Sequence, residues 1–196
     1  MHNLIFDFGN VLVQWQPERV YLPYFHGDEA QYWYFWRHVC TQEMRNRIDA
    51  GEDQRSCIDR QKRLFPDYAE PLDMFITHWE ETLPDEMPGM KELVQQLLDD
   101  PRYNIFGLTN WSMETFPLAR EKFPILQMID KYIVSADVHL VKPDPAIFRL
   151  ALERFGIDAA DTTFIDDNPA NVEAAKQMGM QGIVFCGADK LREQLR

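Results

Sequence analysis

Apolar and polar positions alternate in a regular rhythm over most of the chain. Residues 3–8 (N-L-I-F-D-F) form a short apolar run that ends at Gly9-Asn10, which is typical of a buried strand entering a turn. Four later apolar runs predict further strands at 103–109, 132–135, 162–165 and 182–185. Amphipathic segments between and after them predict helices at 87–99, 112–122, 145–155, 169–178 and 188–195. Strands that alternate with helices indicate a doubly wound parallel sheet.

Local signals mark the ends of several predicted helices. Pro88 suits a helix start, and Ser112 is a candidate N-cap for the helix at 112–122. Gly156 and Gly179 follow two amphipathic segments directly and predict helix stops.

The residue composition and periodicity differ between the first strand and residue 85. Glycines are sparse, aromatics are dense, and the segments 28–39, 54–65 and 68–83 have helical periodicity. We therefore expect an α/β fold with a Rossmann-like three-layer core at 1–13 and 86–196, and a small helical cap domain at 14–85. The tryptophans of this block are interpreted as its hydrophobic core: Trp15, Trp33, Trp36 and Trp79.

Composition and charge narrow the classes of partner. The 196 residues carry a formal net charge of -12, which disfavours nucleic acid and anionic membrane surfaces. No apolar run approaches the roughly 20 residues needed to span a bilayer, and no secretory signal is recognised. Three scattered cysteines without C-x-x-C spacing indicate reduced thiols. We expect a cytoplasmic protein that is a monomer or a weak homodimer.

Polar residues follow four of the five predicted strands. Asp7 follows the first strand and Thr109-Asn110 the second, while the third leads to Lys142. The fourth ends at Asp166-Asp167, with Asn171 one helical turn later. Since ligands of open α/β sheets bind beyond the carboxyl ends of the strands, these side chains are expected to line one crevice.

The charges of these residues indicate phosphoryl chemistry. Asp7, Asp166 and Asp167 would repel one another unless a cation joined them, and carboxylates with water suit Mg²⁺. Lys142 adds a fixed positive charge, and Thr109 and Asn110 add neutral hydrogen bonds. A carboxylate nucleophile would divide hydrolysis into two steps through an aspartyl-phosphate.

The motifs D-F-G-N-V, L-T-N, V-K-P-D-P and I-D-D-N-P-A-N, in this order, resemble the four motifs of the haloacid dehalogenase-like superfamily. The resemblance covers the predicted core, and the helical block resembles the cap of many members. Within the superfamily, L-T-N-W-S, K-P-D-P-A-I-F and F-I-D-D-N look most like the bacterial α-D-glucose-1-phosphate phosphatase branch and the N-terminal phosphatase domain of soluble epoxide hydrolase.

The resemblance implies a role for each matching position. Asp7 matches the nucleophile and a metal ligand, and Gly9 matches a backbone carbonyl ligand. Thr109 and Asn110 match the phosphate-binding pair, and Lys142 the lysine that steadies nucleophile and phosphate. Asp167 matches the main acidic metal ligand, and Asp166 is a second candidate for that role. Asn171 matches a polar position that orients the groups around the metal.

One position departs from the pattern of most superfamily phosphatases, which have a second aspartate, the general acid and base, two residues after the nucleophile. This chain has Gly9 there. A missing proton donor costs roughly 10²- to 10⁴-fold in rate. The glucose-1-phosphatase branch resembles this chain in that glycine, and an anomeric leaving oxygen would need less help from an acid.

The sequence therefore predicts a Mg²⁺-dependent phosphatase for a small phosphorylated metabolite, such as the sugar phosphate glucose 1-phosphate. Two alternatives stay open. One is a 2-haloacid dehalogenase that uses Asp7 without metal, and the other is a non-catalytic phosphate-binding regulator that lost its acid at Gly9. The charged residues at 43–53 are interpreted as a solvated face, although Arg45 or Asp49 could reach a substrate.

Overall fold

The computed structural model describes residues 1–195. Its five strands form one sheet in the order β3-β2-β1-β4-β5, and every neighbouring pair is parallel. The strands are β1 (His2–Phe6), β2 (Tyr103–Thr109), β3 (Tyr132–Val134), β4 (Thr162–Asp166) and β5 (Gln181–Val184). The predicted α/β class and parallel sheet are confirmed, with strand ends within two residues of expectation.

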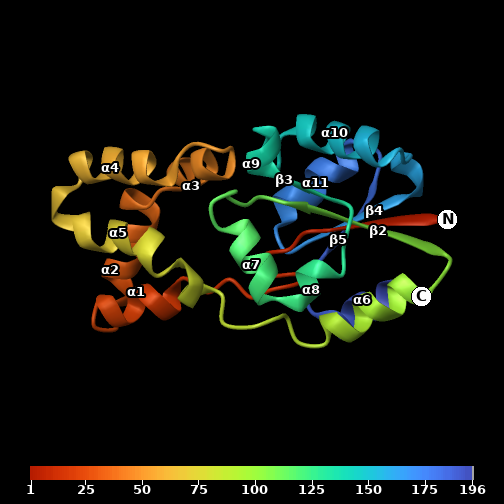
Figure 1. The fold of residues 1–196 in the computed structure, drawn as a ribbon, viewed down its shortest axis with the longest axis horizontal. Coiled ribbons are helices and arrows are strands. Elements are labelled where there is room, and N and C mark those ends of the chain that lie inside the picture. Colours follow the sequence, from red (N-terminus) through yellow and green to blue (C-terminus); the bar gives the residue numbers. More distant parts are fainter. Residues whose placement is uncertain (196) are drawn as a thin grey trace.

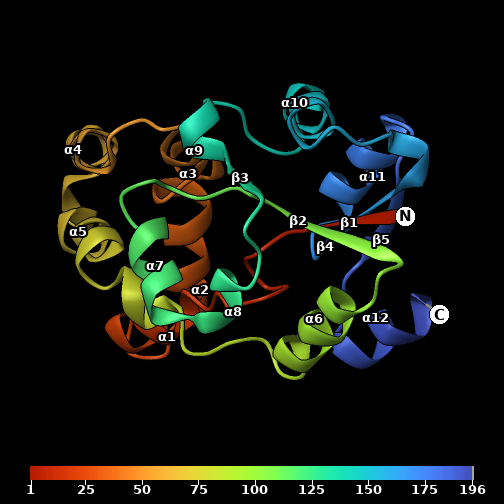
Figure 2. The ribbon, with the colours of Figure 1, turned by 45° about the vertical axis from the view of Figure 1, so that its right-hand side comes forward.

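Helices cover both faces of the sheet (Figure 2). Leu4 and Phe6 of β1 pack on one side, while Ile5 packs on the other, so the strand is buried on both faces. The first side carries α6 (Met90–Asp99), α7 (Phe116–Lys122), α8 (Pro124–Gln127) and α12 (Ala188–Gln194). The second carries α10 (Pro145–Phe155) and α11 (Pro169–Gln177). These are the three layers expected of a Rossmann-like core.

A separate helical block lies beyond the carboxyl ends of the strands, opposite the N-terminus (Figure 1). Its helices are α1 (Glu18–Tyr24), α2 (Glu29–Tyr34), α3 (Gln42–Asp49), α4 (Gln54–Leu64) and α5 (Ala69–Thr77). It also contains a π-helical turn, η1 (Phe35–Val39), and the short 3₁₀ segments η2 (Pro66–Tyr68) and η3 (Trp79–Thr82). The buried side chains of this block form a hydrophobic cluster of their own.

The chain enters and leaves the block at adjacent points. Val13 and Glu86 form an antiparallel bridge. Beside it, the Gln14 N–H donates to the Asp85 carbonyl at 2.9 Å, and the Met87 N–H donates to the Leu12 carbonyl at 2.7 Å. On this basis we propose residues 1–13 and 86–196 as the core domain and 14–85 as the cap domain, and we use "cap" for the latter below.

Several predicted elements need correction. The helix expected from Ser112 begins instead at Phe116, because Pro117 occupies its first turn and the Ser112 hydroxyl accepts from the Glu114 N–H in a preceding turn. The segment 68–83 is not one helix, since α5 ends at Thr77 and η3 follows. Helices α1 and α3 were not predicted. The stop at Gly156 is confirmed, with Gly156 at φ 65°.

Within residues 1–195, no helix combines the length and the apolar character needed to cross a bilayer. The cytoplasmic location stays a prediction.

The cap core offers a matched test of packing. Leu72 is completely buried among the apolar residues of the cap, whereas Leu64 is 66% exposed. Leu72→Ala should lower the free energy of unfolding by about 2–5 kcal/mol through lost contacts and a cavity, and Leu64→Ala should change it by less than about 0.5 kcal/mol. Urea unfolding followed by circular dichroism measures both. Equal, small losses would contradict the cap core described here.

Candidate active site

Adjacent strand ends place the acidic residues together. Phe6 pairs with Ile165 in the parallel register, so the next residues, Asp7 and Asp166, leave neighbouring strands side by side. The Asp7 N–H still donates to the Ile165 carbonyl, at 2.9 Å. One carboxylate oxygen from each of Asp7, Asp166 and Asp167 lies within 4.8 Å of the others.

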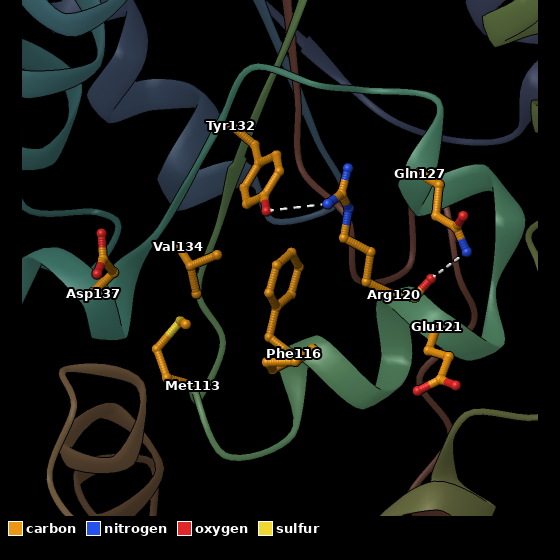
Figure 3. A pocket seen from close by; sticks show the side chains of 9 residues that line it. Met113, Phe116, Arg120, Glu121, Gln127, Tyr132, Val134 and Asp137 are labelled. Carbon is orange, nitrogen blue, oxygen red and sulfur yellow. Dashed lines mark hydrogen bonds between the residues drawn. The ribbon is translucent and has the colours of Figure 1, made fainter.

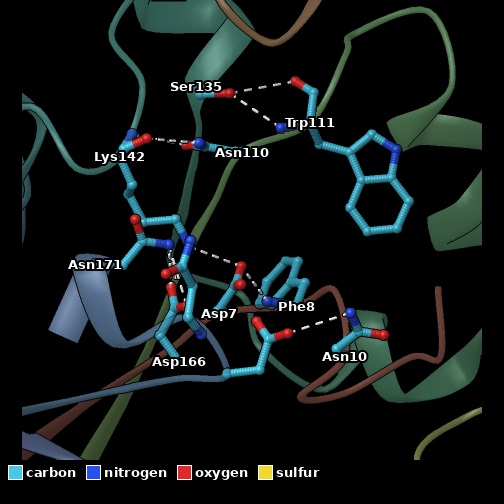
Figure 4. Close-up of polar contacts among 11 residues, drawn as sticks. Asp7, Phe8, Asn10, Asn110, Trp111, Ser135, Lys142, Asp166 and Asn171 are labelled. Carbon is cyan, nitrogen blue, oxygen red and sulfur yellow. Dashed lines mark hydrogen bonds and ion pairs between the residues drawn. The ribbon is translucent and has the colours of Figure 1, made fainter. Parts of the chain in front are cut away.

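Lys142 projects between two of these carboxylates (Figure 4). Its Nζ lies 2.8 Å from Asp7 Oδ1 and 2.7 Å from Asp166 Oδ2. The lysine is 3% exposed. Burial alone lowers the pKa of Lys142, but the carboxylates of Asp7 and Asp166 outweigh it and raise the pKa above its ordinary value. The lysine therefore remains an ammonium group inside the protein.

The two residues of the acidic pair have different surroundings. Asp166 is completely buried, and its carboxylate accepts hydrogen bonds from Asn171 Nδ2, at 3.1 and 3.0 Å, and from the Asn168 N–H, at 2.8 Å, in addition to Lys142. Asp167 is partly exposed and accepts from Asn10 Nδ2 at 3.2 Å. Asp167 therefore has more free coordination capacity than Asp166.

The electrostatics of the cluster call for a cation. Three carboxylates against one ammonium leave two formal negative charges in a buried space. Burial raises the pKa of Asp7 to about 7, with Asp166 and Asp167 adding to the rise and Lys142 opposing it. Burial, followed by the charge of Asp166, also raises the pKa of Asp167. A divalent cation on these oxygens would remove the repulsion, and an all-oxygen donor set fits Mg²⁺.

Three buried side-chain polar atoms lack a partner within residues 1–195: the Tyr21 hydroxyl in the cap, and Thr109 Oγ1 and Asn171 Oδ1 in the core. The two core atoms belong to the end of β2 and to the helix that follows β4. Thr109 is 1% exposed and ends β2. Unpaired buried polar atoms are costly in a folded protein, so the presence of the two core atoms beside the acidic cluster indicates groups that await a ligand.

The side chain of Asn110 is already engaged. Its Nδ2 donates to the Lys142 carbonyl at 3.0 Å, and its Oδ1 accepts from the Lys142 N–H at 2.9 Å. This pair of bonds ties the loop after β2 to the loop that carries Lys142. The direct effect of the Asn110 side chain is thus to position Lys142.

Asn10 is a site residue that the sequence interpretation passed over. It has a positive φ of 55°, a conformation that asparagine tolerates better than most residues. Its amide joins the two sides of the site, since Nδ2 donates to Asp167 and Oδ1 accepts from the Trp15 N–H at 2.9 Å. The turn signal Gly9-Asn10 directly after Asp7 was the available clue.

A cavity of about 310 Å³ lies between the acidic cluster and the cap. Asp7, Gly9 and Asp167 line it from the core. Four tryptophans line it: Trp15, Trp36, Trp79 and Trp111. The interpretation of the cap tryptophans as cap core holds for Trp36 but is wrong for Trp15 and Trp79, since Trp15 is 39% exposed and Trp79 packs against the hydrophobic cluster of the core. Trp33 is not part of the cap core and does not line the cavity. Its side chain is 41% exposed, and the Arg37 guanidinium lies over its ring.

The sequence interpretation of the charged residues at 43–53 is a solvated face, with Arg45 or Asp49 as the residues that could reach a substrate. Both residues, which belong to α3, line the cavity. Sequence alone leaves this open because α3 carries charges on both of its long faces, and its docking on the core decides which face is enclosed.

A second hollow, of about 690 Å³, lies beside the edge strand β3 and α7 (Figure 3). Three of its polar residues contact one another. Arg120 Nη1 donates to the Tyr132 hydroxyl at 3.4 Å, and Gln127 Nε2 donates to the Arg120 carbonyl at 2.8 Å. None of the clustered carboxylates lines it, so the smaller cavity is the candidate active site.

A sequence model of the haloacid dehalogenase-like hydrolases matches residues 37–185, well over half of the chain. The matched stretch begins after Asp7. Flavin mononucleotide hydrolase 1 of Arabidopsis thaliana is 31% identical over 109 residues, which cover 56% of this chain and 44% of the plant protein. The chain spans less than half the length of the curated relatives it matches.

Solved structures share the whole fold. A HAD family enzyme from Bacteroides thetaiotaomicron, in complex with magnesium and inorganic phosphate, has a TM-score of 0.75 at 20% identity and covers 100% of both chains. An L-2-haloacid dehalogenase has a TM-score of 0.68 at 18% identity, over 93% of this chain and 85% of that chain. At these identities the likeness establishes the fold alone.

Removing the buried ammonium tests the charge balance of the site. Lys142→Met should lower the free energy of unfolding by about 3–5 kcal/mol, because Asp7 and Asp166 are then buried without their counter-charge. Lys91→Met is the matched control, since the Lys91 side chain is 50% exposed and the change should cost less than about 0.5 kcal/mol. Urea unfolding in a chelator gives both values. A loss as small as that of the control would contradict the role of Lys142 as internal counter-ion.

Proposed function

Because the chain belongs to the haloacid dehalogenase-like hydrolase family, we propose that it is a Mg²⁺-dependent phosphatase for a small phosphorylated metabolite, which acts through an aspartyl-phosphate on Asp7. The observation that carries the proposal is the Asp7 carboxylate, oriented by Lys142 beside two further acids and lining the cavity between core and cap.

The hydrogen-bond donors around Asp7 orient its carboxylate and favour its ionised form, as a nucleophile requires. Asp7 Oδ1 accepts from Lys142 Nζ at 2.8 Å and from the Phe8 N–H at 2.7 Å, which fixes the plane of the carboxylate. The other oxygen is free of hydrogen bonds within residues 1–195 and is the atom available for attack on phosphorus. The same ammonium group would stabilise negative charge on the transferring phosphoryl group.

The metal would be held by Asp7, Asp167 and the backbone carbonyl of Gly9, with Asp166 as a further candidate and Asn171 orienting the set. When bound, Mg²⁺ would neutralise the phosphate oxygens and those of the acids. Asn171 Oδ1 and Thr109 Oγ1, both without partners, would then contact the water shell and the phosphate, respectively. Asn110 would act through Lys142 and through its own backbone. The structural neighbour is a complex with magnesium and inorganic phosphate, which supports Mg²⁺ as the metal and a phosphoryl group as the part of the substrate that is bound.

The cavity supports a small organic group on the phosphate, and we propose a sugar phosphate such as glucose 1-phosphate, as in the glucose-1-phosphate phosphatase branch. A volume of about 310 Å³ is at the small end of ligand cavities. Trp15, Trp36 and Trp111 give the cavity aromatic walls, and polar side chains such as Asn10 and Gln54 line it as well, which suits the apolar and hydroxyl-bearing parts of a sugar.

The cluster speaks against a metal-free dehalogenase. Such an enzyme would have to keep Asp7 ionised next to two more carboxylates with only one ammonium group nearby. Hydrolysis that continues undiminished in a chelator would favour the dehalogenase over the phosphatase.

Asp7→Asn tests the nucleophile. The amide keeps the shape of the carboxylate but cannot form the acyl phosphate, so phosphate release should fall to background while the fold is retained. A release assay over sugar phosphates, nucleotides and small phosphorylated acids, with circular dichroism of the variant, measures this. Normal turnover by Asp7→Asn would refute the assignment.

Asp167→Asn tests the metal site. Loss of one anionic ligand should raise the Mg²⁺ concentration for half-maximal activity by roughly 10- to 100-fold or more. Asp130→Asn, at an exposed position of the core, should leave the titration unchanged. An identical titration for both variants would remove Asp167 from the metal shell.

A further inference from the structure

The C-terminal end of α3 contacts the core at the segment that follows β3. The Ser135 hydroxyl donates to the Asp49 carbonyl at 2.6 Å and accepts from the Trp111 N–H at 3.0 Å. His139 Nδ1 lies 2.8 Å from the Ala50 carbonyl. Gly51, with φ 94°, approaches so closely that a Cβ would lie 2.7 Å from the Ala136 carbonyl oxygen. The backbone of Asp49 is therefore fixed relative to the loops that carry Asn110 and Lys142.

The side chain of Asp49 faces the same cavity as Asp7. Within residues 1–195, the carboxyl groups that line this cavity belong to Asp7, Asp49 and Asp167, and no histidine, glutamate or cysteine lines it. Asp7 and Asp167 already have roles in the proposed chemistry. Among these three carboxyl groups, the proposed chemistry gives no role to Asp49.

The neighbours of Asp49 do not neutralise it. The guanidinium of Arg45 is directed elsewhere, since it donates to the Trp36 and Cys40 carbonyls and to Gln42 Oε1 and lies over the Trp36 ring. The Asp49 carboxylate has no hydrogen-bond or ion-pair partner among the described residues. Burial raises the pKa of Asp49 to about 7, while the positive charges of Arg45 and Lys142 act in the opposite direction. A carboxyl group with such a pKa is suited to give and take protons near neutrality.

Within residues 1–195, the core has no side chain at position 9, two residues after the nucleophile, that could act as a general acid. Gly9 lines the cavity, and a Cβ built there would meet no atom within 4 Å. Packing therefore does not require glycine at this position. Because Gly9 has no side chain, a general acid for the reaction has to come from another residue that lines the cavity.

We propose that Asp49 is the general acid and base of the reaction, acting on the leaving oxygen of the substrate from the cap side of the cavity. The proposal rests on the proposed phosphatase function. Protonated Asp49 gives its proton to the leaving oxygen as the bond from that oxygen to phosphorus breaks and the bond from Asp7 to phosphorus forms, which releases an alcohol. The Asp49 carboxylate then takes a proton from water as the water oxygen attacks phosphorus. The bond from Asp7 to phosphorus breaks, phosphate leaves, and both aspartates return to their starting states.

The test compares leaving groups of similar shape. Phenyl phosphate and p-nitrophenyl phosphate bind through the same groups, but p-nitrophenolate leaves without a proton whereas phenolate leaves poorly. Asp49→Asn should lower kcat/KM for phenyl phosphate by roughly 10²-fold and leave that for p-nitrophenyl phosphate nearly unchanged. Asp67→Asn, at an exposed position of the cap, should alter neither. The parameter kcat/KM is chosen because it reports the first step, in which the leaving group departs.

A rescue experiment separates proton transfer from binding. Gly9→Asp in the Asp49→Asn background should restore turnover of phenyl phosphate, because position 9 has room for a carboxyl group beside the reacting atoms. Equal losses on both aryl phosphates, or no loss on either, would overturn the proposal by showing a binding role or none. A wild-type protein that releases no phosphate from either ester would instead refute the proposed function, and the inference with it.

Discussion

A lysine buried between two aspartates is the interaction on which the candidate site depends. Lys142 is drawn from a loop after β3, Asp7 from the end of β1, and Asp166 from the end of β4, so a single ammonium group joins three segments distant in sequence. Buried charges of one sign are unstable alone, and the lysine lowers the cost of gathering three acids without cancelling their charge. The negative charge that remains explains both the preference for a divalent cation and the chemistry of a bound phosphoryl group.

The division of labour between core and cap follows from this arrangement. The core fixes the charged groups because parallel strands end at one edge of the sheet, and its loops are tied by Asn110 and Ser135. The cap closes the space above them and contributes aromatic walls. Contact between Gly51 and the 135–139 segment brings α3 to the loops of the sheet. A cap carboxyl group can then complete a reaction centre that lacks one at Gly9.

Much of this architecture was accessible from the sequence, because it depends on short-range pattern. The five strands and most core helices were predicted from apolar periodicity and from signals such as Gly156. Two helix boundaries were predicted wrongly. Helix α7 begins only at Phe116, with Pro117 in its first turn, and α5 ends at Thr77 instead of continuing to residue 83. The helices of the cap were harder to predict. Helix α1 has seven residues with Pro23 among them, and α3 has only Met44 and Ile48 as apolar residues, so both are stabilised by packing of the cap rather than by a clear periodicity.

The sequence by itself determined that acids, a lysine and polar strand ends would gather at the carboxyl edge of a parallel sheet, because strand direction and order along the chain allow few other outcomes. Tertiary structure alone decided that the carboxylate oxygens of Asp166 accept several hydrogen bonds, whereas Asp167 accepts a single side-chain hydrogen bond, from Asn10. It also decided that Asp49 faces the cavity instead of solvent. The reason is that helical periodicity describes a helix relative to its own axis, whereas exposure to a substrate depends on the surface against which that helix is packed.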